Sequence, residues 1–157
     1  MSQVTLKVKR LPHCYALPQY ATSGAAGLDL CAALEEELTL HPGDRVRIPT
    51  GVQVEIPPGF QAQVVPRSGL ADRNGITLTN SPGTIDSDYR GEVQCLVINH
   101  GREPYTFKRG DRIGQMVLVA IPQVELVEVQ ELATSERGAG GFGSSGRNWL
   151  SDYKGQV

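Results

Sequence analysis

The stretch from Asn80 to Glu92 carries the densest set of reactive side chains in this chain. It reads Asn-Ser-Pro-Gly-Thr-Ile-Asp-Ser-Asp-Tyr-Arg-Gly-Glu and lies between two apolar segments, 76–79 and 93–99, that are typical of strands. A hairpin that only reverses the chain needs about two to five residues. This connection is longer and chemically crowded, as is typical of a loop that carries a site. Asp86 is its candidate general base, because a carboxylate can orient a water and accept its proton.

Two further segments could place a charge or bind a phosphate. Segment 26–30, Ala-Gly-Leu-Asp-Leu, puts Asp29 inside an apolar strand, where an isolated carboxylate is costly unless it is paired. An exposed position at a sheet edge would explain Asp29 equally well. Segment 66–71, Pro-Arg-Ser-Gly-Leu-Ala, lies where a predicted strand meets a predicted helix. Arg67, Ser68 and free backbone N–H groups suit phosphate oxygens there, although an ordinary capped turn would look similar.

Two more segments are rich in basic residues or glycine. Segment 107–115, Phe-Lys-Arg-Gly-Asp-Arg-Ile-Gly-Gln, is a basic turn entering a strand, and a charged surface turn is its simplest explanation. Segment 137–146, Arg-Gly-Ala-Gly-Gly-Phe-Gly-Ser-Ser-Gly, has the composition of a phosphate cradle but no Gly-Lys-Ser/Thr, so it is not a P-loop. A disordered tail shares this composition. If the segment folds over a nucleotide, Phe142 would stack on the base and Arg137 would meet the phosphates.

The composition argues against several other functions. The net charge of −2 argues against a general affinity for nucleic acid. The three cysteines lack C-x-x-C spacing and the three histidines lie far apart, which favours free thiols in a reducing compartment and argues against a zinc site. No stretch approaches the ~20 apolar residues that a membrane span needs, and the first ten residues do not resemble a signal peptide. We therefore expect an intracellular protein without a membrane, cytoplasmic by default, although a nucleus or an organelle would fit too.

In the rest of the chain apolar residues recur at every second position, which is the pattern of strands. These strands must position the five segments. Many short strands separated by turn signals predict an all-β sandwich or barrel. The only helical candidates are 68–74, with Ser68 as a cap, and 32–38, whose strand neighbours should override its preference. The predicted strands are 1–10, 28–32, 38–40, 45–49, 51–56, 60–65, 76–79, 93–99, 105–107, 113–121 and 124–129.

The composition changes again near residue 135. We expect residues 1–134 to form one β-barrel domain with at most one short helix. Residues 135–157 are expected to form a flexible arm, because their glycines are too dense for a packed core.

Taken in order and with their separations, these five segments resemble the motifs of the trimeric deoxyuridine triphosphatases (dUTPases). They span residues 26–146, with Gly114 where the family usually has alanine and Ser145 where threonine is common; residues 147–157 lie beyond the last motif. The resemblance implies a distorted jelly-roll β-barrel that forms a homotrimer with active sites at the subunit interfaces. It also implies that the C-terminal arm closes over an active site.

The resemblance further implies an activity, the hydrolysis of dUTP to dUMP and pyrophosphate. Such an enzyme limits uracil in DNA and supplies dUMP for thymidylate synthesis. Asp86 would activate a water for in-line attack on the α-phosphorus, and Asp29 would be a second catalytic residue that helps to position the hairpin and the deoxyribose. Mg²⁺ would be the cofactor, held mainly by substrate phosphates and water without a direct protein ligand.

The resemblance also assigns the substrate contacts. Asn80 and the backbone of the hairpin would read uracil, and Tyr89 would pack beneath the deoxyribose. Phe142 would cover the base. The remaining implied substrate-binding residues are Arg67, Ser68, Gly69, Thr84, Ile85, Asp86, Gln115, Arg137, Gly143, Ser144 and Ser145.

Two other functions fit parts of the sequence. A dCTP deaminase, or a bifunctional deaminase–triphosphatase, would share the fold, but it usually places a glutamate beside the pyrimidine, and the Gly-Phe-Gly arm matches the triphosphatases better. Release of ammonia from dCTP would support it. A catalytically inactive nucleotide sensor would be expected to lack Asp86 or Arg137, and both are present. Tight dUTP binding without pyrophosphate release would support that alternative.

Overall fold

The structure is a computed structural model that describes residues 4–142. The chain divides into two units, Met1–Gln123 and Val124–Val157. All the strands and the helix of the described residues lie in the first unit, and residues 124–142 of the second contain neither. Across residues 4–142, no helix is long and apolar enough to cross a membrane.

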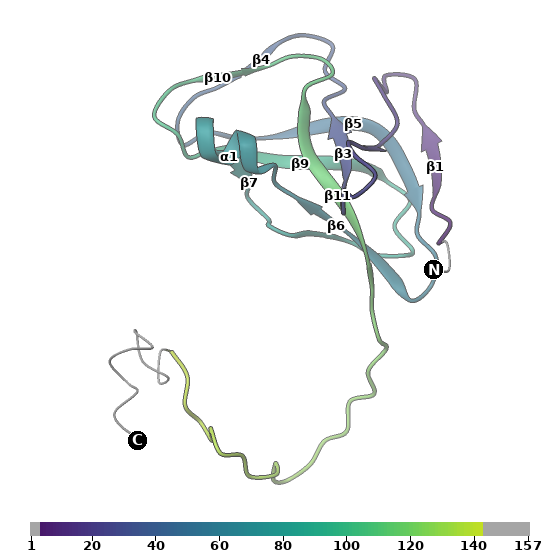
Figure 1. The fold of residues 1–157 in the computed structure, drawn as a ribbon, viewed down its shortest axis with the longest axis vertical. Coiled ribbons are helices and arrows are strands. Elements are labelled where there is room, and N and C mark those ends of the chain that lie inside the picture. The colour runs from purple at the N-terminus through teal and green to yellow at the C-terminus, as the bar shows by residue number, and fades with distance from the viewer. Residues whose placement is uncertain (1–3, 143–157) are drawn as a thin grey trace. The chain divides into compact units, whose positions relative to one another are not determined.

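Antiparallel sheets build the first unit (Figure 1). One sheet has the strand order β1 (Lys7–Arg10), β5 (Arg45–Glu55), β9 (Glu92–Asn99) and β7 (Ile76–Leu78). A five-stranded sheet has the order β2 (Gln19–Tyr20), β3 (Leu28–Cys31), β11 (Arg112–Ala120), β6 (Phe60–Val65) and β8 (Gly83–Ile85). A small ribbon pairs β4 (Leu38–Leu40) with β10 (Tyr105–Phe107), and the helix α1 spans Ser68–Asn74.

The core draws on both sheets. In the first sheet Ile48 and Val97 are fully buried, and in the second Leu30 and Met116 are. Because successive side chains in a strand point to opposite faces, the neighbours of these core residues point outward. Gln115, next to Met116, therefore lies on the outer face of the five-stranded sheet, where it is paired in register with Asp29 of β3.

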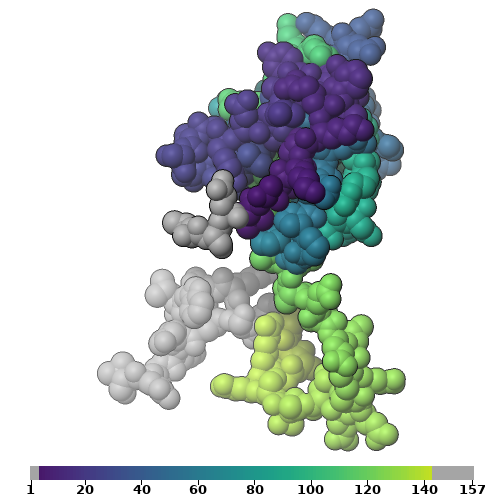
Figure 2. Space-filling model, turned by 90° about the vertical axis from the view of Figure 1, so that its right-hand side faces the viewer, coloured from purple at the N-terminus to yellow at the C-terminus, as the bar shows by residue number. Residues whose placement is uncertain are grey.

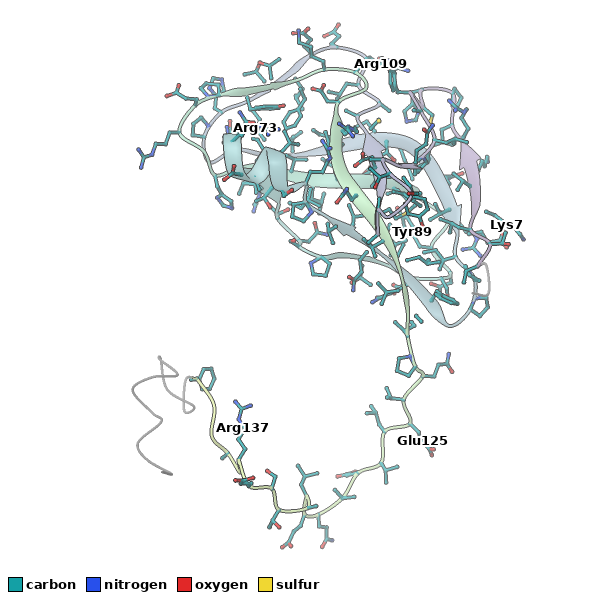
Figure 3. All side chains as sticks on the ribbon, viewed as in Figure 1. Lys7, Arg73, Tyr89, Arg109, Glu125 and Arg137 are labelled. Carbon is teal, nitrogen blue, oxygen red and sulfur yellow. The ribbon has the colours of Figure 1, made fainter. Side chains whose placement is uncertain are left out.

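The segment between β1 and β2, residues 11–18, contains no strand but is tied to the first sheet. Figure 2 shows this part of the chain, in purple, spread over one face of the unit. The Leu11 N–H donates to the Gly51 carbonyl at 2.8 Å, and Cys14 is buried. Gly51 has φ +73°, and a Cβ there would overlap the Cys14 backbone, so only glycine fits. The Arg109 guanidinium, labelled in Figure 3, donates to the His13 carbonyl at 2.8 Å.

The all-β architecture with one short helix is confirmed, and predicted strands 60–65 and 105–107 have the observed bounds. The predicted cap is wrong: the N-cap residue of α1 is Arg67, without a side-chain hydrogen bond. The predicted segments 45–49 and 51–56 form one strand, β5, whose pairing with β9 shifts register between Pro49 and Gln53. Segment 1–10 contributes only the short β1 among its described residues.

Residues 124–129 were predicted as a strand, and this is wrong. The segment is apolar apart from two glutamates, at positions 125 and 128, and it has no pairing partner among the described residues. Its Val124 and Leu126 side chains are 80% and 92% exposed. Without a neighbour to accept its backbone hydrogen bonds and cover its apolar side, a strand has nothing to stabilise it.

Candidate active site

A pocket of about 300 Å³ opens beside the loop between β7 and β9. This volume is at the lower end of the range of small-molecule sites, roughly 300–1,000 Å³. The pocket brings together five residues that the sequence predicted for the site: Asn80, Thr84, Ile85, Asp86 and Tyr89. The other lining residues come from four strands and from β8 itself: Arg47, Val64, Leu78, Gly83, Glu92, Val93, Gln94 and Leu96.

The predicted hairpin is present, since β7 and β9 pair antiparallel with Leu78 opposite Val97. Its connection is not a simple loop, however. Residues Gly83–Ile85 form β8, which pairs with β6 of the other sheet, with Gly83 opposite Val64. The chain thus leaves the sheet of β7, pairs with β6 in the other sheet as β8, and returns to the first sheet as β9. This path holds the pocket residues against the barrel.

Hydrogen bonds within the loop fix the position of Asp86 relative to Tyr89. The Tyr89 N–H donates to the Asp86 carbonyl at 3.2 Å, and the Tyr89 hydroxyl donates to the Glu92 carbonyl at 3.0 Å. The Arg90 guanidinium donates to the carbonyls of Ser87 and Tyr89, at 2.7 and 2.9 Å. No hydrogen bond from the described residues reaches the exposed Asp86 carboxylate, so it is open to a water.

Two glycines allow pocket side chains to pack closely. A Cβ at Gly91 would overlap the Tyr89 hydroxyl, so the tyrosine ring lies directly on this glycine. A Cβ at Gly83 would lie 2.9 Å from Asn80 Nδ2, so the amide of Asn80 rests against the backbone of β8. Both contacts depend on the absence of a side chain.

A second cluster surrounds Asp29, which is only 7% exposed. Its Oδ2 accepts from Arg112 Nη1 at 2.9 Å, and its Oδ1 lies 3.2 Å from Arg67 Nε. Oδ1 also accepts from Gln115 Nε2 at 3.2 Å. Because β3 lies between β2 and β11, the alternative of an exposed edge acid is wrong. Three of the predicted residues, Asp29, Arg67 and Gln115, therefore meet here.

Arg67 connects this cluster to the start of α1. The Leu70 and Ala71 N–H groups donate to the Arg67 carbonyl at 3.1 Å, which leaves Ser68 and Gly69 at the first turn, where N–H groups lack an intrahelical acceptor. The Arg67 side chain turns back toward β11, and its Nη1 donates to the Arg112 carbonyl at 3.3 Å. Hydroxyl, backbone and guanidinium donors are thus gathered at one place.

The pocket and the Asp29 cluster are separate within one chain. They share no lining residue, and no hydrogen bond or ion pair of the described residues joins them. In the five-stranded sheet, β6 lies between β11, which carries Gln115, and β8, which precedes Asp86. The strands β11 and β8 are therefore two strand spacings apart, about 10 Å.

The arm residues belong to the second unit. Arg137 Nε donates to the Gly140 carbonyl at 2.7 Å, and Phe142 is exposed with φ 49°. The predicted residues Gly143, Ser144 and Ser145 lie outside the described residues.

The cysteines are free thiols and two have perturbed acidity. Burial raises the pKa of Cys95 to about 12. Burial, together with the nearby Asp29 charge, raises the pKa of Cys31. Neither thiol is therefore activated as a nucleophile. A Cβ at Gly114 would lie 3.1 Å from Cys95 Sγ, so an alanine at 114 would require the sulfur to move slightly.

Sequence reasoning missed four polar or charged residues at these places: Arg47, Glu92, Gln94 and Arg112. The Glu92 carboxylate accepts from the Gly51 N–H at 2.7 Å and lies 2.8 Å from His13 Nε2, which fastens the end of the loop to β5 and to the N-terminal segment. Arg112 is part of the basic segment 107–115, but only the pairing of β11 with β3 shows that it faces Asp29.

A family model described as dUTPase matches residues 14–146. The chain is similar to the deoxyuridine 5'-triphosphate nucleotidohydrolase of Gloeobacter violaceus, with 53% identity over 93% of this chain and 99% of the relative. It is also similar to the protein of the same name from Anaeromyxobacter sp. (strain Fw109-5), with 56% identity over 92% of this chain and 99% of the relative.

Solved structures are similar as well. A mutant of the Staphylococcus bacteriophage 80alpha dUTPase, solved with dUpNHpp, has a TM-score of 0.80 and 30% identity, covering 91% of this chain and 99% of that one. A mutant dUTPase from phage phi11 of S. aureus, described with a structural Mg(II) ion, has a TM-score of 0.74 and 25% identity, covering 81% of this chain and 97% of that one.

Proposed function

This chain belongs to the dUTPase family and is a dUTP nucleotidohydrolase, and from that premise we propose how its own residues cleave dUTP to dUMP and pyrophosphate. The predicted family, the jelly-roll fold and the enzyme class are confirmed by the family model, the relatives and the solved structures. The observation that carries the proposal is the convergence of Asn80, Asp86 and Tyr89 on one pocket.

Asp86 is the general base in this proposal. Its carboxylate lines the pocket, is exposed, and has no hydrogen-bond partner among the described side chains and backbone groups, so a water can take that place. The turn that fixes Asp86 relative to Tyr89 would hold the water in line with the α-phosphorus. Positioning of this kind supplies much of the catalysis of phosphoryl transfer.

The pocket suits a uracil deoxynucleoside. Leu78, Ile85 and Leu96 offer apolar surface to a flat base, while the Asn80 amide and the backbone of β8, including Thr84, offer hydrogen-bonding groups. A base with the donor–acceptor pattern of cytosine would leave some of these groups unpaired, which is a strong basis for rejection. The Tyr89 ring, held on Gly91, would pack beneath the deoxyribose and exclude a 2′-hydroxyl.

The phosphates need more positive charge than the pocket holds. Arg47 is the only Lys or Arg among the described residues that line it, and Glu92 lines it too. The donors gathered around Arg67, Ser68, Gly69 and Gln115 would supply the missing contacts. From the arm we add Arg137, Gly143, Ser144 and Ser145 for the phosphates, and Phe142 as a cover for the uracil.

Because the pocket and the Asp29 cluster are separate in one chain, we propose that a complete site forms between subunits of a homotrimer. The outer face of the five-stranded sheet supports this proposal. It carries Asp29 and Gln115 together with the half-buried apolar side chains of Val65, Val117 and Val119, which a neighbouring subunit could cover. In that face Asp29 contacts Arg67 and Gln115. As a second catalytic residue it would help to position the hairpin and the deoxyribose, which in this arrangement come from the neighbouring subunit.

The domain limits belong to the same proposal. Residues 1–134 would act as the barrel domain, and residues 135–157 as an arm that closes over an active site. The described part of the arm, residues 135–142, supports this, because it has no strand or helix of its own. A segment of this composition can become ordered when another surface covers it.

We propose Mg²⁺ as the cofactor. Among the described residues no group of three or more His, Cys, Asp or Glu could hold a metal ion, and only Asp86 and Glu92 bring carboxylates to the pocket. This donor set fits an ion bound mainly by phosphate oxygens and water. When bound, the ion neutralises charge on the triphosphate. The phage phi11 dUTPase structure is described with a Mg(II) ion, which supports the choice of metal.

The reaction lowers dUTP, which limits uracil in DNA, and yields dUMP for thymidylate synthesis. We place it in the cytoplasm, because the relatives in Gloeobacter violaceus and Anaeromyxobacter are bacterial. No nucleic-acid or membrane partner is part of the proposal.

The test compares pyrophosphate release from dUTP, dCTP, dTTP and UTP by the purified full chain with Mg²⁺. Asp86→Asn should lower kcat for dUTP by roughly 10²–10⁴, while affinity for the analogue dUpNHpp changes little. Asp88→Asn, an exposed acid in the same loop, is the matched control and should keep its activity. Near-normal turnover by Asp86→Asn would refute the assignment. Ammonia release from dCTP would favour a deaminase.

A further inference from the structure

We propose that Arg112 is a positioning residue for triphosphate binding: it neutralises Asp29 so that Arg67 keeps its charge and its free N–H groups for the phosphates. This inference rests on the proposed function, which places phosphates at Arg67. Arg112 itself has no assigned contact with the substrate.

The two arginines divide the carboxylate of Asp29 between them. Arg112 Nη1 donates to Oδ2 at 2.9 Å, whereas Arg67 Nε lies 3.2 Å from Oδ1. Arg67 Nη1 donates a hydrogen bond to the Arg112 backbone carbonyl at 3.3 Å. Among the described residues Arg67 Nη2 has no acceptor, so its two N–H groups are available to a ligand.

The charges explain why two arginines surround one acid. A buried carboxylate needs a compensating cation, and Arg112 supplies it, which leaves the cluster with one net positive charge from Arg67. If Arg112 were absent, Oδ2 would lose its partner. The Arg67 fork would then be drawn into a two-bond pair with Asp29, since guanidinium and carboxylate prefer that geometry. Its charge would no longer serve the phosphates.

A local irregularity of β11 puts Arg112 in this position. Along a regular strand Arg112 would share a face with Gly114 and Met116, which are buried. The pairing of β11 with β3 shifts register between Arg112 and Gly114, as in a bulge, and Ile113 and Gly114 are then both buried. The shift turns Arg112 to the outer face, where Asp29 and Gln115 lie.

The test uses the full chain with Arg112→Gln, Asp29→Asn and the double variant. Kd is measured for dUpNHpp and for dUMP, and kcat and KM for dUTP. Arg112→Gln should raise KM for dUTP and Kd for dUpNHpp about 10-fold, the scale of one charge-assisted hydrogen bond. The Kd for dUMP and kcat at saturation should change less than about threefold, because phosphate contacts beyond the α-position are the ones affected.

The double variant separates positioning from other roles. Without the Asp29 charge nothing draws Arg67 away, so Arg112→Gln in the Asp29→Asn background should change Kd for dUpNHpp less than about twofold. An equal loss in both backgrounds would overturn the inference, as would equal weakening of dUMP and dUpNHpp.

Two further variants serve as controls. Arg102→Gln, an exposed arginine outside both clusters, should leave Kd unchanged. Arg112→Lys keeps the charge beside Asp29 and should bind dUpNHpp within about threefold of the unmodified chain; a loss as large as that of Arg112→Gln, with an unchanged melting temperature, would contradict the charge argument. If Arg112→Gln does not fold, Arg112→Met, which also removes the charge but keeps an apolar stem, replaces it in both Asp29 backgrounds, with the same expected losses. Failure of the unmodified chain to hydrolyse dUTP would refute the proposed function, whereas unchanged binding by Arg112→Gln in an active enzyme would refute only this inference.

Discussion

Replacing Gly83 with alanine tests whether the Asn80 amide reads the base. Gly83 is buried in β8 opposite Val64, and its φ is not in the left-handed region, so the backbone accepts alanine. The added Cβ would lie 2.9 Å from Asn80 Nδ2 and 3.4 Å from Asn80 Cγ. Because this amide is the end of a flexible, exposed side chain, it should move away while the strand stays in place.

The expected loss is that of one neutral hydrogen bond between the amide and the base. Such a bond contributes about 0.5–1.5 kcal/mol, and about 1.4 kcal/mol corresponds to a factor of ten. We therefore expect kcat/KM for dUTP to fall by about 2- to 13-fold. Stability should not fall, because glycine inside a strand is itself unfavourable relative to alanine.

The assay compares kcat/KM for dUTP and dCTP in Gly83→Ala, Asn80→Ala and the double variant. If both changes act through the amide, each single variant should lose the same factor and the double variant no more. Gly24→Ala is the control, since a Cβ there meets nothing within 4 Å. The reasoning is refuted if Gly83→Ala keeps full kcat/KM, or if its loss persists in the Asn80→Ala background.

Two further predictions concern the sugar and the core. Tyr89→Ala removes the ring packed on Gly91 and should improve kcat/KM for UTP relative to dUTP by about tenfold; an unchanged ratio of the two would remove the steric role of the ring. Burial raises the pKa of Cys95 to about 12 from 9.0, so the folded state favours the neutral thiol; its contribution to the free energy of unfolding is complete below pH 9 and falls by roughly 1 kcal/mol per pH unit toward pH 12. Urea unfolding between pH 8 and 11 should show a smaller decline for Cys95→Ala than for the unmodified chain, and equal declines would contradict the assignment.

Local pattern was sufficient for the strands whose residues alternate and whose ends carry turn residues. Segments 60–65 and 105–107 were predicted with their observed bounds, because the period of two and the flanking turns are properties of a few neighbouring residues. Local sequence was a poor guide for 124–129, where three valines favour a strand but no paired strand is found among the described residues. It also missed β8, a segment of three residues inside a turn-rich loop.

The residue types of the pocket were likewise readable, because Asn80, Asp86 and Tyr89 lie within ten residues of one another in a single crowded loop. The partners of Asp29 were not. Arg112 and Gln115 are 83 and 86 positions away from it along the chain, and Arg112 faces it only because β11 shifts register beside β3. A one-residue change of register reverses the face of every following side chain, and no property of segment 107–115 alone reports such a shift.

By itself, then, the sequence determined the all-β class, the order of the five motif segments and the chemistry that each segment could perform, since these depend on residue identity and short-range spacing. Only the tertiary structure decided that Asp29 is shared by Arg67, Arg112 and Gln115, and that this cluster lies two strands away from the pocket of Asp86. The reason is physical: which side chains meet across a sheet is set by strand order and register, and these come from the packing of the whole barrel.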